Sequence, residues 1–162
     1  MTHRLYLNDD WLFTEQFEDS LVAPEYPENT LQPVRLPHTC KETPFHYFDE
    51  SLYQMVSGYR RHLLIPKDWQ GKRILLTFEG AAHDSTVFCN GKKVGEHHCG
   101  YTAFTVDLTD NVLYGQDNLL CVRLDSRENL NVLILSILVD TFISKISFPM
   151  QPGPEIGSIS DA

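Results

Sequence analysis

Apolar and polar residues alternate with a period of two along much of this 162-residue chain. The clearest runs cover residues 59–65, 74–79, 104–108 and 119–124. Because successive side chains of a strand point to opposite faces of a sheet, this period predicts strands with one buried face. Clusters of Gly, Pro, Asn and Asp separate the runs about every ten residues, and no long stretch has a helical period. The pattern is typical of an all-β antiparallel β-sandwich.

The strongest local signal is an Asn-Gly pair, Asn90-Gly91, between the β-prone runs 86–89 and 92–95. A two-residue type I′ turn needs positive φ at both central residues, and Asn and Gly adopt such values readily. The sequence therefore predicts a β-hairpin centred on this pair.

The N-terminal part is less regular. We predict short strands at residues 11–13 and 34–36, the second ended by Pro37. Between them, the acidic and proline-bearing stretch 15–33 is predicted to be a solvated surface loop. Residues 38–54 read as a long loop rich in polar and aromatic side chains.

The apolar phase of each run defines the expected core. Residues on one phase of a strand share a face, so they should be buried together. The predicted core comprises Trp11, Leu63, Leu76, Phe78, Val87, Phe104, Val106, Leu120 and Val122.

Length and charge exclude several classes of protein. A chain of 162 residues suits one domain but not a (β/α)₈ barrel, which needs roughly 250 residues. With 13 Lys and Arg against 22 Asp and Glu, the formal net charge is −9. An acidic surface disfavours binding to nucleic acid or to anionic membranes. The first residues lack the apolar stretch of a secretory signal, and no apolar run nears the roughly 20 residues of a membrane-spanning helix, so we expect a cytoplasmic chain.

Cysteine and histidine residues raise the question of a metal site. The cysteines, at Cys40, Cys89, Cys99 and Cys121, form no C-x-x-C pair and are expected to stay reduced. His97, His98 and Cys99 are consecutive, with His38 upstream. Neighbouring residues on an extended chain point to opposite faces, so they do not converge on one ion. We expect a polar loop there, with no metal and no cofactor.

No catalytic pair stands out. Glycosidases need two carboxyl groups roughly 5 to 9.5 Å apart. Four carboxylates near strand ends are candidates, Glu79, Asp84, Asp107 and Asp125, but their spacing favours ordinary strand ends and turn caps. The chain also lacks the G-x-S-x-G, G-x-G-x-x-G and Walker A motifs. We therefore assign no catalytic residue and expect this chain alone to be inactive.

Exposed aromatic side chains could stack on sugar rings. The candidates are Trp11, Trp69, Tyr101, Phe45, Tyr47 and Phe48. Beside Leu12 and Phe13, Trp11 is expected in the core, whereas Trp69 in a loop could serve either role. The three aromatic residues of the 38–54 loop could pack against a neighbouring domain.

A series of motifs, in order, resembles the start of family 2 glycoside hydrolases, the relatives of β-galactosidase and β-glucuronidase. The resemblance covers roughly residues 5–130. The motifs are Asn-Asp-Asp-Trp-Leu-Phe at 8–13, Val-Arg-Leu-Pro-His-Thr at 34–39, Gly-Tyr-Arg-Arg at 58–61, Leu-Thr-Phe-Glu-Gly-Ala at 76–81, the hairpin at 87–95, the segment 98–104 and the strand 117–125.

The resemblance implies a non-catalytic, N-terminal "sugar-binding" jelly-roll domain, similar to galactose-binding domains. The parent enzyme would act on β-linked sugars in carbohydrate metabolism, most simply as a β-galactosidase. Its other domains, and a β-galactoside bound by the whole enzyme, would be the partners of this chain. A free-standing carbohydrate-binding module is the alternative, and the DNA downstream of Ala162 would separate the two.

Several positions depart from the family pattern. Cys40 replaces a Trp, Cys99 replaces the first of two glycines, and Leu133 and Ile134 stand where two prolines are usual. Asp140 falls where the family has an acidic residue near the sugar pocket, which makes it the one candidate substrate-binding residue. No Gly-Gly-Ile-Tyr-Arg segment, immunoglobulin-like domain or catalytic barrel follows. The chain therefore resembles a truncated or frameshifted fragment.

The C-terminal part carries an apolar, uncharged run at residues 130–139. We expect a last strand at 143–148, a sandwich domain over 1–148 and a flexible tail over 149–162. Uncharged β-prone runs pair readily with other strands, so self-association through 130–139 is expected.

Overall fold

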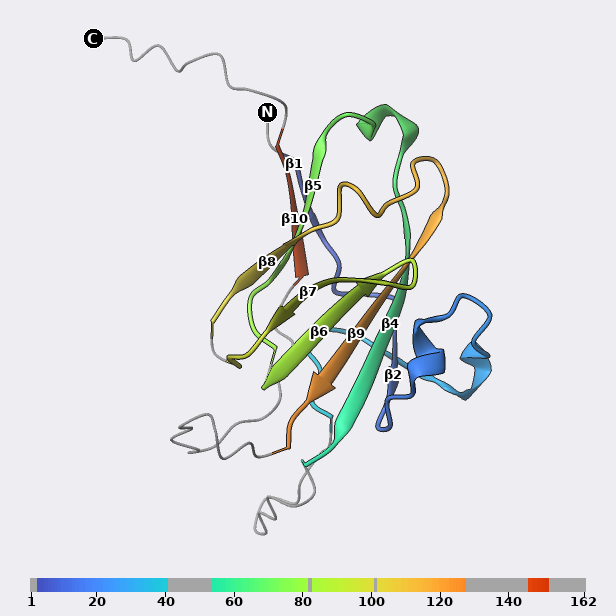
Figure 1. The fold of residues 1–162 in the computed structure, drawn as a ribbon, viewed down its shortest axis with the longest axis vertical. Helices are drawn as coiled ribbons and strands as arrows, with labels where there is room; N and C mark the ends of the chain where they lie inside the picture. Colours follow the sequence, from blue (N-terminus) through green and yellow to red (C-terminus); the bar gives the residue numbers. More distant parts are fainter. Residues whose placement is uncertain (1–2, 41–53, 82, 101, 128–145, 152–162) are drawn as a thin grey trace, which may run out of the picture.

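The computed structural model describes residues 3–40, 54–81, 83–100, 102–127 and 146–151, and these form two antiparallel sheets (Figure 1). The first sheet has the strand order β1 (His3–Tyr6), β10 (Ile146–Gln151), β5 (Arg73–Phe78) and β8 (Phe104–Asp107). The second has the order β3 (Gln32–Val34), β2 (Trp11–Thr14), β4 (Val56–Leu64), β9 (Asp117–Asp125), β6 (Asp84–Cys89) and β7 (Lys92–His97). The predicted all-β antiparallel β-sandwich is confirmed.

Short 3₁₀ helices are the only helical elements of the described residues: η1 (Asp19–Val22), η2 (Glu28–Thr30) and η4 (Lys67–Trp69). None has both the length and the apolar character needed to cross a bilayer.

The main core lies between the sheets and contains the residues predicted from the apolar alternation. All the predicted core residues are buried except Phe104, which is partly buried and packs against the core. Phe104 lies on β8, at the edge of the four-stranded sheet, and its ring stacks on Phe78 with centroids 4.8 Å apart. An edge strand has no neighbour on one side, which explains the remaining exposure of Phe104.

The predicted hairpin is confirmed between β6 and β7. Its turn residues have positive φ, 50° at Asn90 and 82° at Gly91. Farther along β7, a Cβ at Gly95 would lie 2.9 Å from a methyl carbon of Val106 on β8. Glycine there allows the two sheets to approach closely.

Two boundaries differ from the prediction. The short strand expected at 34–36 is β3 at Gln32–Val34, because Val34 pairs with Trp11 while Leu36 instead donates its backbone N–H to the Asn8 carbonyl oxygen at 2.7 Å. The last strand, expected at 143–148, is β10 at Ile146–Gln151, which pairs with both β1 and β5. The runs 130–139 and 152–162 lie outside the described residues.

The stretch predicted as a solvated loop, residues 15–33, instead covers part of the outer face of the six-stranded sheet. Leu21 and Leu31 are buried and form a second, smaller core with Cys121 of β9. In Figure 1 this segment, which contains η1 and η2, lies beside β2 and β4. The prediction of a solvated loop was wrong because acidic side chains alternate there with apolar ones that face the sheet.

Contact between this cover and the sheet is tightest at Gly58 of β4. A Cβ at this position would overlap the Leu21 side chain and lie 3.1 Å from the Thr14 methyl carbon. Residue 58 is thus a glycine because there is no room for a side chain, not because the backbone has a positive φ.

We predict that Gly58→Ala lowers the free energy of unfolding by about 1 to 3 kcal/mol, the usual cost of overpacking. Urea denaturation followed by tryptophan fluorescence measures the change. The double variant Gly58→Ala/Leu21→Ala is the control, since removing the Leu21 side chain makes room for the added methyl. Additive losses in the double variant would show that the two sites do not interact.

Candidate functional site

One end of the six-stranded sheet brings together several of the positions that the sequence singled out. Val56 of β4 and Asp84 of β6 are both Cα partners of Asp125, the last residue of β9, and we call this region the Asp125 end. Ser126 next to it exchanges hydrogen bonds with the Met55 backbone at 3.0 and 3.3 Å. These bonds fix the place where the chain leaves the sheet.

Cys40 belongs to the same end, since its Sγ lies 3.8 Å from the Ser57 hydroxyl and 3.5 Å from that of Tyr59. Tyr59 also shares a hydrogen bond of 2.9 Å with Nδ1 of His38. Burial raises the pKa of the Tyr59 phenol and lowers that of the His38 imidazole. Because Cys40 and Tyr59 are buried, this cluster holds the chain in place and offers no open reactive group.

Most of the candidate sugar-contacting residues are not available for that role or lie outside the described chain. Trp11 is fully buried and donates its indole N–H to the Leu7 carbonyl oxygen at 2.6 Å, which confirms a core role. Trp69 ends η4 and packs against the main core while partly exposed. The substrate-binding candidate Asp140 lies outside the described residues, as do four aromatic candidates, Phe45, Tyr47, Phe48 and Tyr101.

Three of the four candidate carboxylates, Asp84, Asp107 and Asp125, are held in ion pairs. Asp125 accepts hydrogen bonds from Arg127 at 2.6 and 2.8 Å, and these, with that of Arg123, lower its pKa despite its burial. For Asp107, burial would raise the pKa, but hydrogen bonds from Thr109 and Arg73 outweigh it and lower the pKa. A general acid needs a raised pKa instead.

Asp84 and Asp125 are the one pair of these carboxylates that the fold brings to facing positions. Asp84 is engaged by Nδ1 of His98 at 3.2 Å, while Asp125 is engaged by two arginines. Glu79 is exposed. The arrangement is that of charged groups in a surface network, not of an acid and a nucleophile facing an open cleft.

The histidine and cysteine candidates point to different partners. His97 bonds the Thr102 hydroxyl at 2.8 Å and stacks on Phe104, while His98 faces Asp84. Over the part of the chain that the structure describes, no three His, Cys, Asp or Glu side chains gather as a metal site would require. Burial raises the thiol pKa to about 11 for Cys89 and about 12 for Cys121, which keeps both thiols protonated.

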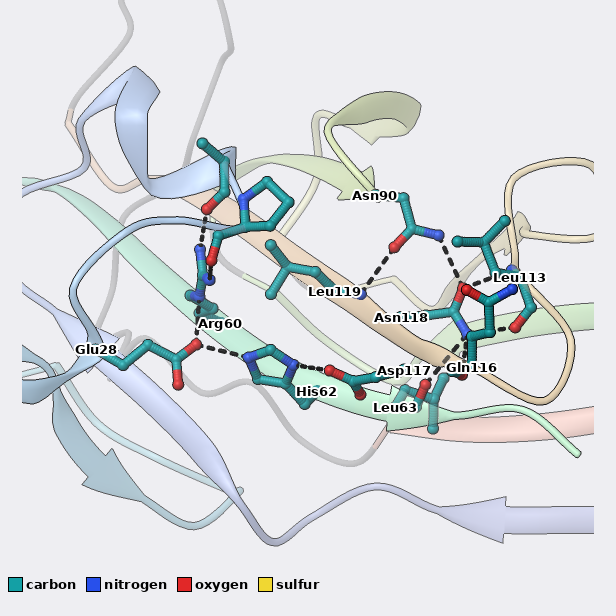
Figure 2. A network of polar contacts seen from close by, with 12 residues as sticks. Glu28, Arg60, His62, Leu63, Asn90, Leu113, Gln116, Asp117, Asn118 and Leu119 are labelled. Carbon is teal, nitrogen blue, oxygen red and sulfur yellow. Dashed lines mark hydrogen bonds and ion pairs between the residues drawn. The ribbon is translucent and has the colours of Figure 1, made fainter.

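A buried arginine, whose burial the sequence analysis did not predict, organises the middle of the six-stranded sheet (Figure 2). Arg60 of β4 is fully buried, and its guanidinium donates to the backbone oxygens of Leu21, Ala23 and Pro24 at 2.6 to 3.0 Å. Its Nε donates to Glu28 at 2.7 Å. Four acceptors thus tie the cover segment to the sheet through one side chain.

His62 extends this network toward β9. Its Nε2 lies 2.7 Å from the Glu28 carboxylate, and its Nδ1 bonds the carboxylate of Asp117. Each ring nitrogen faces a carboxylate, which can only accept a hydrogen bond. Both bonds therefore form only when the imidazole is doubly protonated. The carboxylates also stand at opposite nitrogens of the ring, which excludes this trio as the ligand set of one metal ion.

A second polar centre lies at the far end of β9. The side-chain amide of the fully buried Asn118 donates to the carbonyl oxygens of Leu63, Leu113 and Gln116 at 2.9 to 3.3 Å. Its oxygen accepts from Asn90 at 2.8 Å, and Asn90 in turn binds the Leu119 N–H at 2.9 Å. The hairpin turn is thereby fastened to β9 and to the loop before it.

A profile of the family described as "Glycosyl hydrolases family 2, sugar binding domain" matches residues 5–133. A β-galactosidase from Thermoanaerobacter pseudethanolicus is 38% identical over 84% of this chain, and a β-glucuronidase from Bacteroides fragilis is 32% identical over 81%. In both cases the match spans only 18% of the relative.

The fold is shared with solved structures. A crystal structure of Bacteroides uniformis β-glucuronidase superposes on 94% of this chain and 18% of its own with a TM-score of 0.78, at 24% identity. This likeness confirms the jelly-roll type of the sandwich.

We predict that Arg60→Met lowers the free energy of unfolding by about 2 to 4 kcal/mol, because it removes the guanidinium donors of three backbone carbonyl oxygens and the ion pair with the partly exposed Glu28 carboxylate. Urea denaturation measures the loss, and limited proteolysis should cut residues 15–31 first. Arg73→Met is the control, since Arg73 is exposed and pairs with Asp107 at the surface. An equal effect of the two substitutions would contradict the role given to Arg60.

The His62 network predicts a stability that depends on pH. Burial would lower the pKa of His62, but hydrogen bonds to Glu28 and Asp117 outweigh it and raise the pKa above the ordinary 6.5. A group whose pKa is raised by folding stabilises the folded state fully below its unfolded pKa, about 6.5 for histidine. That stabilisation is lost as the pH rises through the pKa of the folded state.

The unfolding free energy of the native chain should therefore exceed that of His62→Gln at pH 6, with the difference fading toward pH 9. Since His62 is 43% exposed, the difference is expected to be a few tenths to about 1 kcal/mol. Asp117→Asn keeps the imidazole and removes one carboxylate, so it should show a weaker pH dependence. A difference that stays constant with pH would refute the doubly protonated state.

Proposed function

Because the chain belongs to the sugar-binding domain family of family 2 glycosyl hydrolases, we propose that it acts as the non-catalytic N-terminal domain of a longer enzyme that cleaves β-linked sugars. The observation that carries the proposal is the match over residues 5–133 to less than a fifth of each relative. In this proposal the residues that perform the chemistry lie in other domains.

The engaged state of the described carboxylates supports a non-catalytic role. Asp84, Asp107 and Asp125 each pair with a basic side chain within 3.2 Å. A hydrolase would need one carboxylic acid kept protonated beside a second, ionised carboxylate. The domain would instead shape the rim of a sugar site, with its Asp125 end toward the rest of the enzyme, and Asp140 would contact the sugar.

We further propose a β-galactoside as the substrate of the parent enzyme. The support is the 38% identity to the Thermoanaerobacter β-galactosidase, against 32% to the Bacteroides fragilis β-glucuronidase. A free-standing carbohydrate-binding module is the alternative function, and its mark would be sugar binding by this chain alone.

A pair of chimeras tests the proposal. In each of the two relatives named above, the matching region is replaced by residues 5–133 of this chain or simply deleted. We expect the β-galactosidase chimera to hydrolyse nitrophenyl β-galactoside while its deletion form does not, with weaker rescue of glucuronide hydrolysis in the other chimera. The chain alone should hydrolyse neither compound.

Other outcomes would overturn specific parts of the proposal. Chimeras no more active than the deletion forms would refute the role as a domain of such an enzyme. Better rescue of the β-glucuronidase would refute the β-galactoside. Calorimetric titration of the isolated chain with methyl β-galactoside is the control, because binding without any rescue would favour the free-standing module.

A further inference from the structure

The two sheets of the described residues have four edge strands, and three of these edges are protected. Strand β3 has only 3 residues and carries Pro33, which has no backbone N–H to offer to another strand. Strands β7 and β8 lie against each other, because Gly95 of β7 approaches Val106 of β8 closely. The ring of His97 also stacks on that of Phe104, with centroids 4.4 Å apart. Features of this kind keep a sheet edge from pairing with another chain.

The fourth edge, β1, lacks such protection. Its register with β10 runs without a shift from His3 to Tyr6, and none of its residues is a proline. Leu5 is 46% exposed and Tyr6 is 60% exposed, which makes them two of the four large apolar side chains that are exposed in the described part of the chain. Because neighbouring residues of a strand face opposite sides, β1 offers apolar surface on both faces of its edge.

Strand register gives the face to which each position of β1 belongs. Tyr6 is the Cα partner of Ser147, which is in turn the partner of Thr77 on β5. Leu76 and Phe78, on either side of Thr77, are buried in the core and mark the inner face. Residues 4 and 6 therefore belong to the outer face of the sheet, and residue 5 belongs to the inner one.

The sequence of β1 is complementary to itself in one register. A two-fold axis perpendicular to the sheet pairs two copies of β1 antiparallel and keeps like faces together, and most of the strand pairs only if the axis lies at residue 4 or 5. An axis at residue 4 sets two arginines directly opposite each other, and like charges so placed are destabilising. An axis at residue 5 sets Leu5 against the partner's Leu5 and Arg4 against the partner's Tyr6, both favourable cross-strand pairs.

We propose that β1 pairs with β1 of a second copy of this chain, antiparallel and centred on Leu5, so that the four-stranded sheets of two copies become one continuous sheet. Backbone hydrogen bonds between the two edges supply the affinity, and the side-chain pairs select the register. With so few residues on each side, the interface is smaller than the roughly 1,200 Å² of a stable complex, so the dimer is a weak one. The inference needs neither a further domain nor a sugar, and so it stands apart from the proposed function.

Sedimentation equilibrium of the 162-residue chain tests the pairing. Because each copy carries a formal charge of −9, the solution contains about 0.15 M salt, which screens charges beyond about 8 Å. We expect the weight-average mass to rise from that of the monomer toward twice that value between about 10 µM and 1 mM. Leu5→Lys should abolish the rise, because it sets two lysines face to face at the axis. Leu64→Lys is the matched control and should leave the rise unchanged, since Leu64 is 67% exposed but lies on β4 in the other sheet.

Disulfide formation under mild oxidation tests the register. Leu5→Cys places two thiols at directly opposite positions, whose Cα atoms are about 4.5 to 5.5 Å apart, a separation that a disulfide spans. Tyr6→Cys places the two thiols on a diagonal of about 7 to 8 Å, which a disulfide does not span without backbone movement. We expect covalent dimers from Leu5→Cys, whereas Tyr6→Cys should give no more than the native chain with its own four cysteines.

Three results would overturn the proposal. A chain that stays monomeric up to about 1 mM forms no such dimer. A dimer that Leu5→Lys leaves intact has its contact elsewhere, as in the run 130–139. Cross-linking of Tyr6→Cys as efficient as that of Leu5→Cys contradicts the register. Circular dichroism checks that Leu5→Lys is folded, and the disulfide experiment decides the proposal if it is not.

Discussion

The buried guanidinium of Arg60 is the interaction on which the rest of this structure depends. A charge taken out of water costs several kcal/mol, so it is tolerated only where acceptors surround it. Those acceptors all come from the segment that covers the sheet, which is thereby made part of the fold. As a result, β4 and β9 are buried on both faces at their centres, and Cys121 and Leu119 are as deeply buried as the residues of the main core.

Local patterns predicted the strands well and their surroundings poorly. Alternation, the Asn-Gly turn and the apolar phase are set by neighbours in the sequence, and the core residues and the hairpin were predicted correctly from them. The same alternation did not reveal that Arg60 and His62 bind a covering segment, because a period of two tells which residues share a face and not what covers that face. The residues that bind Arg60 lie more than thirty positions before it in the sequence. A glycine two residues before it, Gly58, was the one hint in the sequence that something packs closely on this part of the strand.

The family of the domain could be recognised from the sequence, but the contacts of the candidate residues could not. The ordered motifs identified the domain, whereas three of the four candidate carboxylates and the candidate histidines of the described chain proved to be engaged by a neighbour. Pairing of this kind depends on strand register, as with Asp84 opposite Asp125, which spacing in the sequence does not reveal. The hub at Asn118 was missed for the same reason, since it joins its own loop to the carbonyl oxygen of Leu63, 55 residues away.

Register also explains where the domain would contribute to a sugar site under the proposed function. Strands β4, β6 and β9 are aligned so that Val56, Asp84 and Asp125 meet at one end. Bonds between Ser126 and Met55, and between Asp125 and Arg127, tie the chain to the sheet at this end. Loops carried on a rigid scaffold are where binding residues concentrate. Under the proposed function, the Asp125 end would therefore be the part of the sandwich that faces the sugar site.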